Sequence, residues 1–304
     1  MQKRTLTGML ALGAAATLAL AGCSGSGSEG GSDAGGSGED NGTITLGYLP
    51  GWTDGLSTAY LLEDQLGKMG YSVEMEELTD AGVLYAGLAG GDFDIYPSAW
   101  PEVTHASYME EFGDQIEDLG GYYDGAVLTL AVPEYVDIDS IEDLAGEADR
   151  FGGEIICIEP GAGLTAQTQD VAMPEYGLDG DYELVTSSTA TMLATLQDKI
   201  DNEEDVVVTL WRPFWANDAF PLKDLEDPQG AMGEAETLHF LGKQGIAEEF
   251  PEVADYIADI KLDDVAYGAL EGLVTGDEYQ DDPEGAVDAW LEEYGDAYPG
   301  LIAS

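Results

Sequence analysis

Apolar and polar residues follow two different periods along this chain, and the two kinds of stretch alternate. Alternation over about four to eight residues is typical of half-buried strands, whereas apolar residues three and four apart are typical of helices. We expect strands at Thr43–Leu49, Tyr71–Leu78, Asp92–Tyr96, Gly125–Val132, Glu154–Ile158, Tyr182–Val185, Asp205–Leu210 and Thr237–Leu241. We expect helices at Ser57–Met69, Ala81–Ala89, Ser140–Leu144, Gly163–Met173, Thr189–Asn202, Pro251–Ile260, Leu262–Thr275 and Pro283–Tyr294.

This order of elements predicts an α/β protein. Strands that alternate with helices build βαβ units and a mainly parallel sheet. Near the apolar strand at Gly125–Val132 we expect the chain to cross into a second lobe. Ligands of open α/β sheets bind at the carboxyl ends of the strands, so residues just past those ends are the first candidates for a site.

Three tryptophans follow expected strands closely. Trp52 comes after Pro50 and Gly51, Trp100 follows a strand that Pro97 is expected to end, and Trp211 follows Asp205–Leu210. His105 lies five positions beyond Trp100. These side chains are candidates for one shared crevice, although on this segment alone a core tryptophan and a surface histidine explain Trp100 and His105 equally well.

A glycine-containing loop, Glu159–Gly163, joins a buried strand to a helix. Backbone N–H groups at a helix start have no intrahelical partner, so such a loop can bind an anion. It is not a P-loop, because no Gly-Lys-Ser/Thr follows, and it lacks the third glycine of the dinucleotide fingerprint. A plain tight turn is the alternative.

The first 42 residues differ from the rest in composition. Residues 1–23 have a basic head and an apolar run that ends in Leu-Ala-Gly-Cys, which resembles a bacterial lipoprotein signal with Cys23 as the lipidated residue. Residues 24–42 are nearly all Gly, Ser, Asp and Glu, the composition of a flexible tether. Only Cys157 then remains, so we expect no internal disulfide.

The charge of the chain is extreme. Nine Lys and Arg stand against 62 Asp and Glu, and after residue 23 seven basic residues remain, for a formal charge of −55. Binding of nucleic acid through a basic patch is therefore excluded. Disorder does not fit the frequent, periodic apolar residues. We interpret the charge as adaptation to high salt, which screens self-repulsion.

The candidate residues favour a ligand with two different ends. Indole faces attract weakly hydrated quaternary ammonium groups. Backbone N–H groups and a histidine can bind a carboxylate. No nucleophile elbow, no metal-ligand cluster and no cofactor motif is visible, so catalysis lacks support and we expect neither a metal nor a cofactor.

Several motifs resemble the glycine betaine-binding lipoproteins of ABC importers. They are Gly51-Trp52, Ala99-Trp100-Pro101 with His105, Ile158–Gly163, Trp211-Arg212-Pro213, and the stretches 225–230 and 233–236. The resemblance spans about residues 43–294. It implies a two-lobed, type II periplasmic-binding-protein fold with the ligand between the lobes, the first lobe comprising 43–127 and 231–304 and the second 128–230.

The resemblance also implies roles for particular residues. Trp52, Trp100 and Trp211 correspond to the cage around the ammonium group. His105 corresponds to the histidine that contacts the ligand carboxylate, and the backbone N–H groups of Cys157 and Ile158 correspond to its other donors. Family members often have glycine at the position of Cys157 and histidine at that of Phe214.

We therefore expect a non-enzymatic, lipid-anchored protein on the extracytoplasmic face of the membrane. It would capture glycine betaine and pass this zwitterion to a permease and ATPase for osmoprotection. Choline, carnitine and proline betaine are alternative ligands. An extracellular enzyme that acts on choline-like compounds and a sensor that signals without transport are alternative functions.

Overall fold

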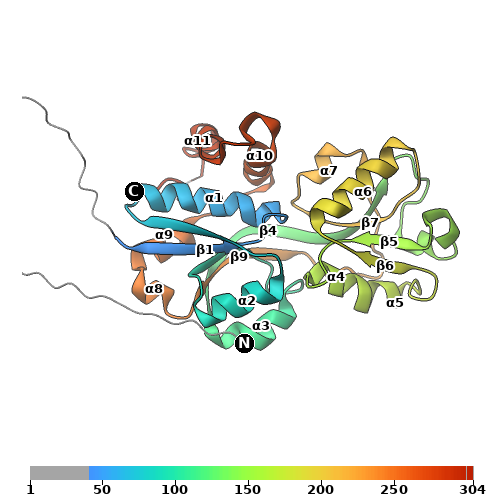
Figure 1. Ribbon diagram of the computed structural model, residues 1–304, viewed down its shortest axis with the longest axis horizontal. Helices are drawn as coiled ribbons and strands as arrows, with labels where there is room; N and C mark the ends of the chain where they lie inside the picture. The colour runs from blue at the N-terminus through green and yellow to red at the C-terminus, as the bar shows by residue number, and fades with distance from the viewer. Residues whose placement is uncertain (1–40, 299, 304) are drawn as a thin grey trace, which may run out of the picture. The chain divides into compact units, whose positions relative to one another are not determined.

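The computed structural model describes residues 41–298 and 300–303. The expected signal segment, Cys23 and nearly all of the expected tether lie outside the described residues. The described part is a mixed α/β structure, shown in Figure 1 with its helices on both faces of the sheet.

Nine strands of the described chain pair in the order β2-β1-β3-β9-β4-β7-β5-β6, and β8 adds to β4. Their bounds are β1 Thr43–Tyr48, β2 Ser72–Glu77, β3 Ile95–Ala99, β4 Ile116–Pro133, β5 Glu154–Cys157, β6 Glu183–Thr186, β7 Val208–Arg212, β8 Leu222–Asp224 and β9 Glu236–Lys243. The strands at the two ends of this order pair in parallel, β1 with β2 and β5 with β6. In the middle, β9 is antiparallel to β3 and β4, and β4 is antiparallel to β7. The expected mainly parallel sheet is therefore a mixed one.

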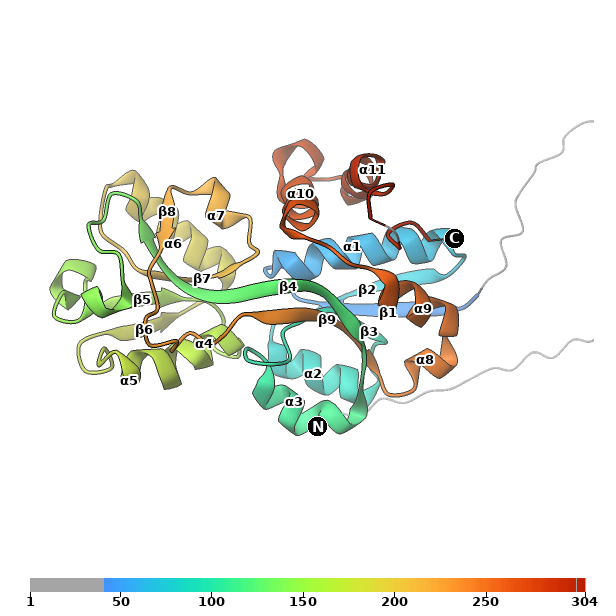
Figure 2. The same ribbon diagram turned by 180° about the vertical axis from the view of Figure 1, so that it is seen from behind.

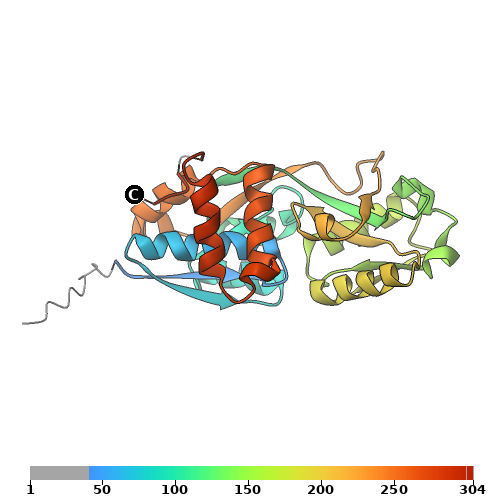
Figure 3. The same cartoon turned by 90° about the horizontal axis from the view of Figure 1, so that it is seen from above.

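The helices pack as layers on the sheet. Their bounds are α1 Thr53–Lys68, α2 Ala81–Gly90, α3 Ala106–Phe112, α4 Gly163–Gln167, α5 Met173–Glu175, α6 Thr189–Asp201, α7 Ala216–Ala219, α8 Ile246–Glu249, α9 Pro251–Asp259, α10 Asp264–Thr275 and α11 Pro283–Tyr294. Helices α1, α10 and α11 lie on the opposite face of the β1–β3 region from α2 and α3 (Figures 1 and 2). Figure 3 shows α10 and α11 side by side over α1.

Strand β4 connects the two ends of the sheet. Residues from Ile116 to Ala126 pair with β9, and from Val127 onward the same strand pairs with β7. The crossing that the sequence suggested is thus one long strand, and we define its two sides as sheet A (β2-β1-β3-β9-β4) and sheet B (β4-β7-β5-β6). The expected start at Gly125 is wrong because bulges near Gly120 and Gly125, both at positive φ, interrupt the alternation without ending the strand.

Strand β3 also differs from the expectation. It begins at Ile95, not Asp92, and continues through Pro97 to Ala99. Its register with β9 is irregular between Tyr96 and Ala99, where Pro97 has no N–H to donate. The strand consequently delivers Trp100 directly from its last residue.

Candidate ligand-binding pocket

A pocket lies where segments of sheet A meet segments of sheet B. Its walls come from the start of α1, the turn after β3, the middle of β4, the loop after β5 and the end of β7. The lining residues are Trp52, Asp54, Trp100, Thr104, His105, Leu128, Ile158, Ala162, Gly163, Leu164 and Trp211. No lysine or arginine is among them.

The three tryptophans named from the sequence all line this cavity. Trp52 precedes the first residue of α1, Trp100 follows β3, and Trp211 lies inside β7, one residue before its end. Each is less than one-tenth exposed. We call Trp52, Trp100 and Trp211 the cage tryptophans.

Carboxylates hold two of these indoles by their polar edges. The indole N–H of Trp100 donates to Oδ2 of Asp54 at 3.0 Å, and the indole N–H of Trp52 donates to Oε2 of Glu159 at 3.3 Å. The ring of Phe214 stacks on Trp211 with centroids 3.9 Å apart. A hydrogen bond or a stacking partner therefore fixes the orientation of every cage ring.

His105 is almost fully buried beside the cage. Its Nδ1 accepts hydrogen bonds from the backbone N–H of Trp100 at 3.2 Å and from the hydroxyl of Tyr85 at 3.0 Å. Its ring stacks on the ring of Trp52, with centroids 5.8 Å apart. Because Nδ1 is an acceptor, the neutral imidazole carries its proton on Nε2.

Burial also decides the charge of this histidine. Desolvation lowers the pKa of His105 to about 3. At neutral pH the ring is thus an uncharged N–H donor. Such a donor can bind a carboxylate without repelling a cation in the same pocket.

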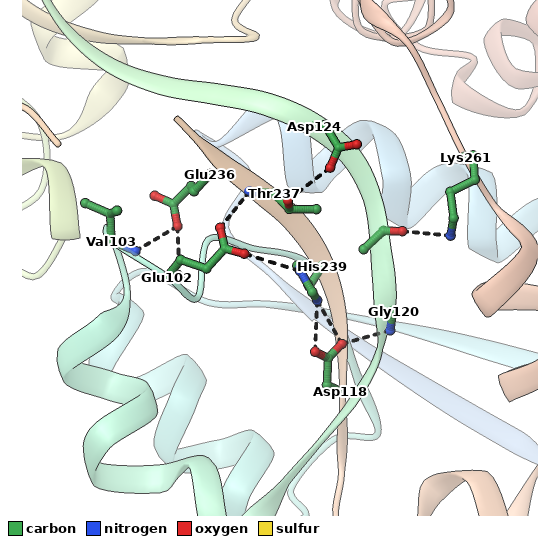
Figure 4. A network of polar contacts seen from close by, with 10 residues as sticks. Glu102, Val103, Asp118, Gly120, Asp124, Glu236, Thr237, His239 and Lys261 are labelled. Atoms are coloured by element: carbon green, nitrogen blue, oxygen red, sulfur yellow. Dashed lines mark hydrogen bonds and ion pairs between the residues drawn. The ribbon is translucent and has the colours of Figure 1, made fainter. Parts of the chain in front are cut away.

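The turn between Trp100 and His105 depends on Glu236 at the start of β9 (Figure 4). The carboxylate of Glu236 accepts the backbone N–H groups of Glu102, Val103 and Thr104, each at 3.0 Å. Three donors from one turn converge on one buried acid, which fixes the path of the chain that carries the tryptophan and the histidine.

The loop after β5 packs directly on this turn. A Cβ at Gly163 would lie 1.8 Å from the carbonyl oxygen of Thr104, so only glycine allows the approach. The hydroxyl of Tyr108 donates to the carbonyl oxygen of Gly161 at 2.7 Å. These contacts join a segment of sheet A to a segment of sheet B at the edge of the pocket.

The anion-binding hypothesis concerns the same loop. Gly163 and Leu164 are the first residues of α4, line the pocket, and carry N–H groups without an intrahelical partner. These N–H groups lie where the sequence suggested an anion site, and anion binding there stays a prediction.

Cys157 and Ile158, whose backbone N–H groups are expected to donate to the ligand carboxylate, differ in position. Ile158 lines the cavity, but Cys157 does not. The sulfur of Cys157 is 3.2 Å from the hydroxyls of Thr165 and of Thr209, so its side chain packs against these two residues. The ligand roles of both residues, like those of His105 and the cage tryptophans, stay predictions.

The sequence reasoning missed Asp54. It is 3% exposed, lines the pocket, and accepts hydrogen bonds from Ser98 at 2.7 Å and from Trp100. Burial raises its pKa. Asp54 precedes the helix expected from Ser57, and one more acid in a chain with 62 Asp and Glu gave no signal.

The side chains of Trp290 and His239 lie outside the pocket. Trp290 is fully buried in α11 and donates to the carbonyl oxygen of Ala266 at 2.8 Å. His239 on β9 is bonded to Asp118 at 2.9 Å (Figure 4). Among the described residues no group of His, Cys, Asp and Glu is placed to hold a metal ion.

The fold and the aromatic pocket define a ligand-binding protein of the type II periplasmic class. More particularly, the chain belongs to the family described as the substrate binding domain of the ABC-type glycine betaine transport system, whose model matches residues 42–293. The members of this family are transport substrate-binding proteins rather than enzymes.

Individual relatives agree with this assignment. The chain is 36% identical over 160 residues to the glycine betaine/carnitine transport binding protein GbuC of Listeria monocytogenes. That match covers 51% of this chain and 49% of GbuC, so the chain spans about half the length of that relative.

Solved structures cover more of the chain. The glycine/betaine/L-proline-binding protein ProX of Borrelia burgdorferi is 29% identical, with a TM-score of 0.77 over 86% of this chain and 96% of that one. Lactococcal OpuAC, closed on glycine betaine, is 27% identical, with a TM-score of 0.77 over 86% and 99%. No helix of residues 41–298 is long and apolar enough to cross a membrane.

Proposed function

We propose that this protein captures glycine betaine, or a close trimethylammonium carboxylate, and hands it to the permease and ATPase of an ABC importer for osmoprotection. In this proposal residues 43–127 with 231–304, and residues 128–230, act as two lobes that close on the ligand. The observation that carries it is the meeting of three tryptophans with a neutral N–H donor, His105, in one pocket whose lining includes no lysine or arginine.

The ammonium end belongs with the cage tryptophans. A soft cation gains from indole faces most where water is excluded, and these three rings are nearly buried. The carboxylate end belongs with Nε2 of His105 and with the backbone N–H groups at Ile158 and the start of α4. Each of these donors makes a stronger hydrogen bond to a charged acceptor than to a neutral one.

Choline is a second candidate, and Asp54 favours it. A buried carboxylate in the pocket attracts any ammonium ligand, but it also accepts a hydrogen bond from a hydroxyl, which choline has and glycine betaine lacks. The carboxylate of a betaine must instead bind at a distance from Asp54. Calorimetric titration with glycine betaine, choline, carnitine and proline betaine ranks these ligands, and no binding by any of them would overturn the proposal.

The position of the protein is part of the proposal. We infer that Cys23 is lipidated after signal removal and that residues 24–42 tether the binding domain on the extracytoplasmic face of the membrane. Mass spectrometry of the membrane fraction should find a lipid-modified Cys23, and Cys23→Ser should release the protein. The neighbouring genes distinguish a transport role from a sensor role. Permease and ATPase genes beside this one would favour transport, which requires both.

A further inference from the structure

A second buried acid, Glu271, lies behind the pocket on α10. It is 2% exposed and accepts a hydrogen bond from the hydroxyl of Thr53. Thr53 is the first residue of α1 and is followed directly by the pocket residue Asp54. The backbone N–H of Trp215, which follows β7, faces the same carboxyl group.

Asp54 and Glu271 are both buried acids. No ion pair within the described part of the chain includes either of them. Burying a carboxylate without a counter-charge is costly, so such a group takes up a proton or waits for a cation. Two acids in one low-dielectric region increase this cost, because each repels the charge of the other.

A chain of hydroxyls also connects the pocket acid to the helix of the deeper one. Ser98 donates to Asp54, the hydroxyl of Tyr122 donates to Ser98 at 2.8 Å, and Tyr267 lies 3.0 Å from Tyr122. Tyr267 is one turn from Glu271 on α10. The pocket therefore contacts α10 by two routes, one through these hydroxyls and one through Thr53.

We propose that Glu271 shares one proton with the pocket acid Asp54, and that the quaternary ammonium group of the ligand displaces this proton into solvent. This inference rests on the proposed function. The ligand supplies the counter-charge that the empty pocket lacks, and binding is tighter when the acid pair has lost its proton.

The other titratable groups near the pocket do not change protonation near pH 7, so Asp54 and Glu271 are the source of the released proton. Burial, followed by the charge of Asp54, raises the pKa of Glu271 to about 8, and burial raises the pKa of Asp54. His105 has a pKa of about 3 and stays neutral near pH 7. Burial raises the pKa values of the three tyrosines that face Asp54 far above this range, so they keep their protons; they are Tyr96, Tyr122 and Tyr267. Asp218, on the exposed side of α7, adds repulsion to Glu271.

The sign of the pH dependence follows from linkage. A bound cation lowers the pKa of the pair, so binding releases protons and affinity rises with pH until the free pair is fully ionised. A one-unit fall in pKa on binding makes Kd fall by about tenfold across the window from about pH 6 to about pH 9.

Titration calorimetry of the intact binding protein tests the inference. Glycine betaine and choline are titrated across this window, and at about pH 7.5 in phosphate and in Tris, because the difference in heat between the two buffers counts the protons released. We expect release of a substantial fraction of one proton and a Kd that falls about tenfold with rising pH. Glu271→Gln, which keeps an acceptor for Thr53, should release almost none and bind with a nearly flat pH profile.

Glu63→Gln is the matched control, since Glu63 is a partly buried acid of α1 outside the ligand pocket. It should keep the wild-type profile. Binding without proton release, or an unchanged slope in Glu271→Gln, would overturn this inference alone. The absence of binding by both ligands at every pH would overturn the proposed function and this inference with it.

Discussion

The two histidines of this chain should respond to acid in opposite directions. His105 is buried, and desolvation lowers its pKa from 6.5 to about 3 on folding. His239 is bonded to Asp118, which raises its pKa. As pH falls below about 6.5, His105 binds a proton in the unfolded chain but stays unprotonated in the folded chain. His105 therefore lowers the free energy of unfolding in acid.

The magnitude for His105 follows from the shift. Each unit of pKa difference corresponds to about 1.4 kcal/mol, so lowering the pH from about 6.5 to about 4 should cost the fold roughly 3 kcal/mol through this residue alone. For His239 the stabilisation is present below its unfolded pKa and is lost as pH rises through its folded pKa. Its ring is partly exposed, and we predict only the sign.

The assay is denaturant unfolding followed by tryptophan fluorescence at a series of pH values in molar salt, which screens the surface carboxylates. The wild type should lose about 3 kcal/mol more than His105→Gln between about pH 6.5 and about pH 4. His239→Gln should leave the curve nearly unchanged over this acid range. Above about pH 6.5 the wild type should instead lose stability relative to His239→Gln, as pH rises through the folded pKa of His239. Parallel curves for the wild type and His105→Gln would refute the claim that this ring stays neutral in the folded state.

Three further outcomes are expected. Replacement of any one cage tryptophan by alanine should weaken glycine betaine binding about tenfold or more in calorimetry, because an indole–cation contact contributes roughly 1–2 kcal/mol. Trp290→Ala, the control, should lower stability and leave affinity almost unchanged. Loss of affinity in Trp290→Ala but not in the cage variants would rule out the cage. Gly163→Ala should weaken ligand binding, since its Cβ would meet the carbonyl oxygen of Thr104, whereas Gly180→Ala has open space around it and should bind as the wild type does. The melting temperature should rise steeply with salt as the Debye length falls below about 10 Å; a flat curve would contradict salt adaptation.

The sequence predicted most elements of the fold because their periodicity is strong. The helix at Pro283–Tyr294 has the expected bounds, and Ser140 caps the short helical turn at 141–144 as its side-chain chemistry suggests. Local patterns failed where tertiary pairing overrides them. Strand β4 continues through glycines that read as breaks, and β3 continues through Pro97, because neighbouring strands hold these segments extended.

The site was predictable only in part for a different reason. Large aromatic residues just past strands are rare enough to attract attention, and all three of them line one cavity. Buried acids give no such signal in a chain with 62 Asp and Glu. Asp54, Glu236 and Glu271 look like surface residues in the sequence, and only packing shows that they hold the pocket together.

Direct titration of the wild-type protein with glycine betaine and with choline tests the central claim most directly. Choline keeps the ammonium group but has a hydroxyl in place of the carboxylate, so it leaves the donors at His105 and the loop after β5 poorly matched. Hydrogen bonds to charged groups contribute roughly 1.5–3 kcal/mol each. We therefore predict one glycine betaine site at least about a hundredfold tighter than that for choline. Choline binding as tight as glycine betaine binding, or no glycine betaine binding at all, would contradict the account.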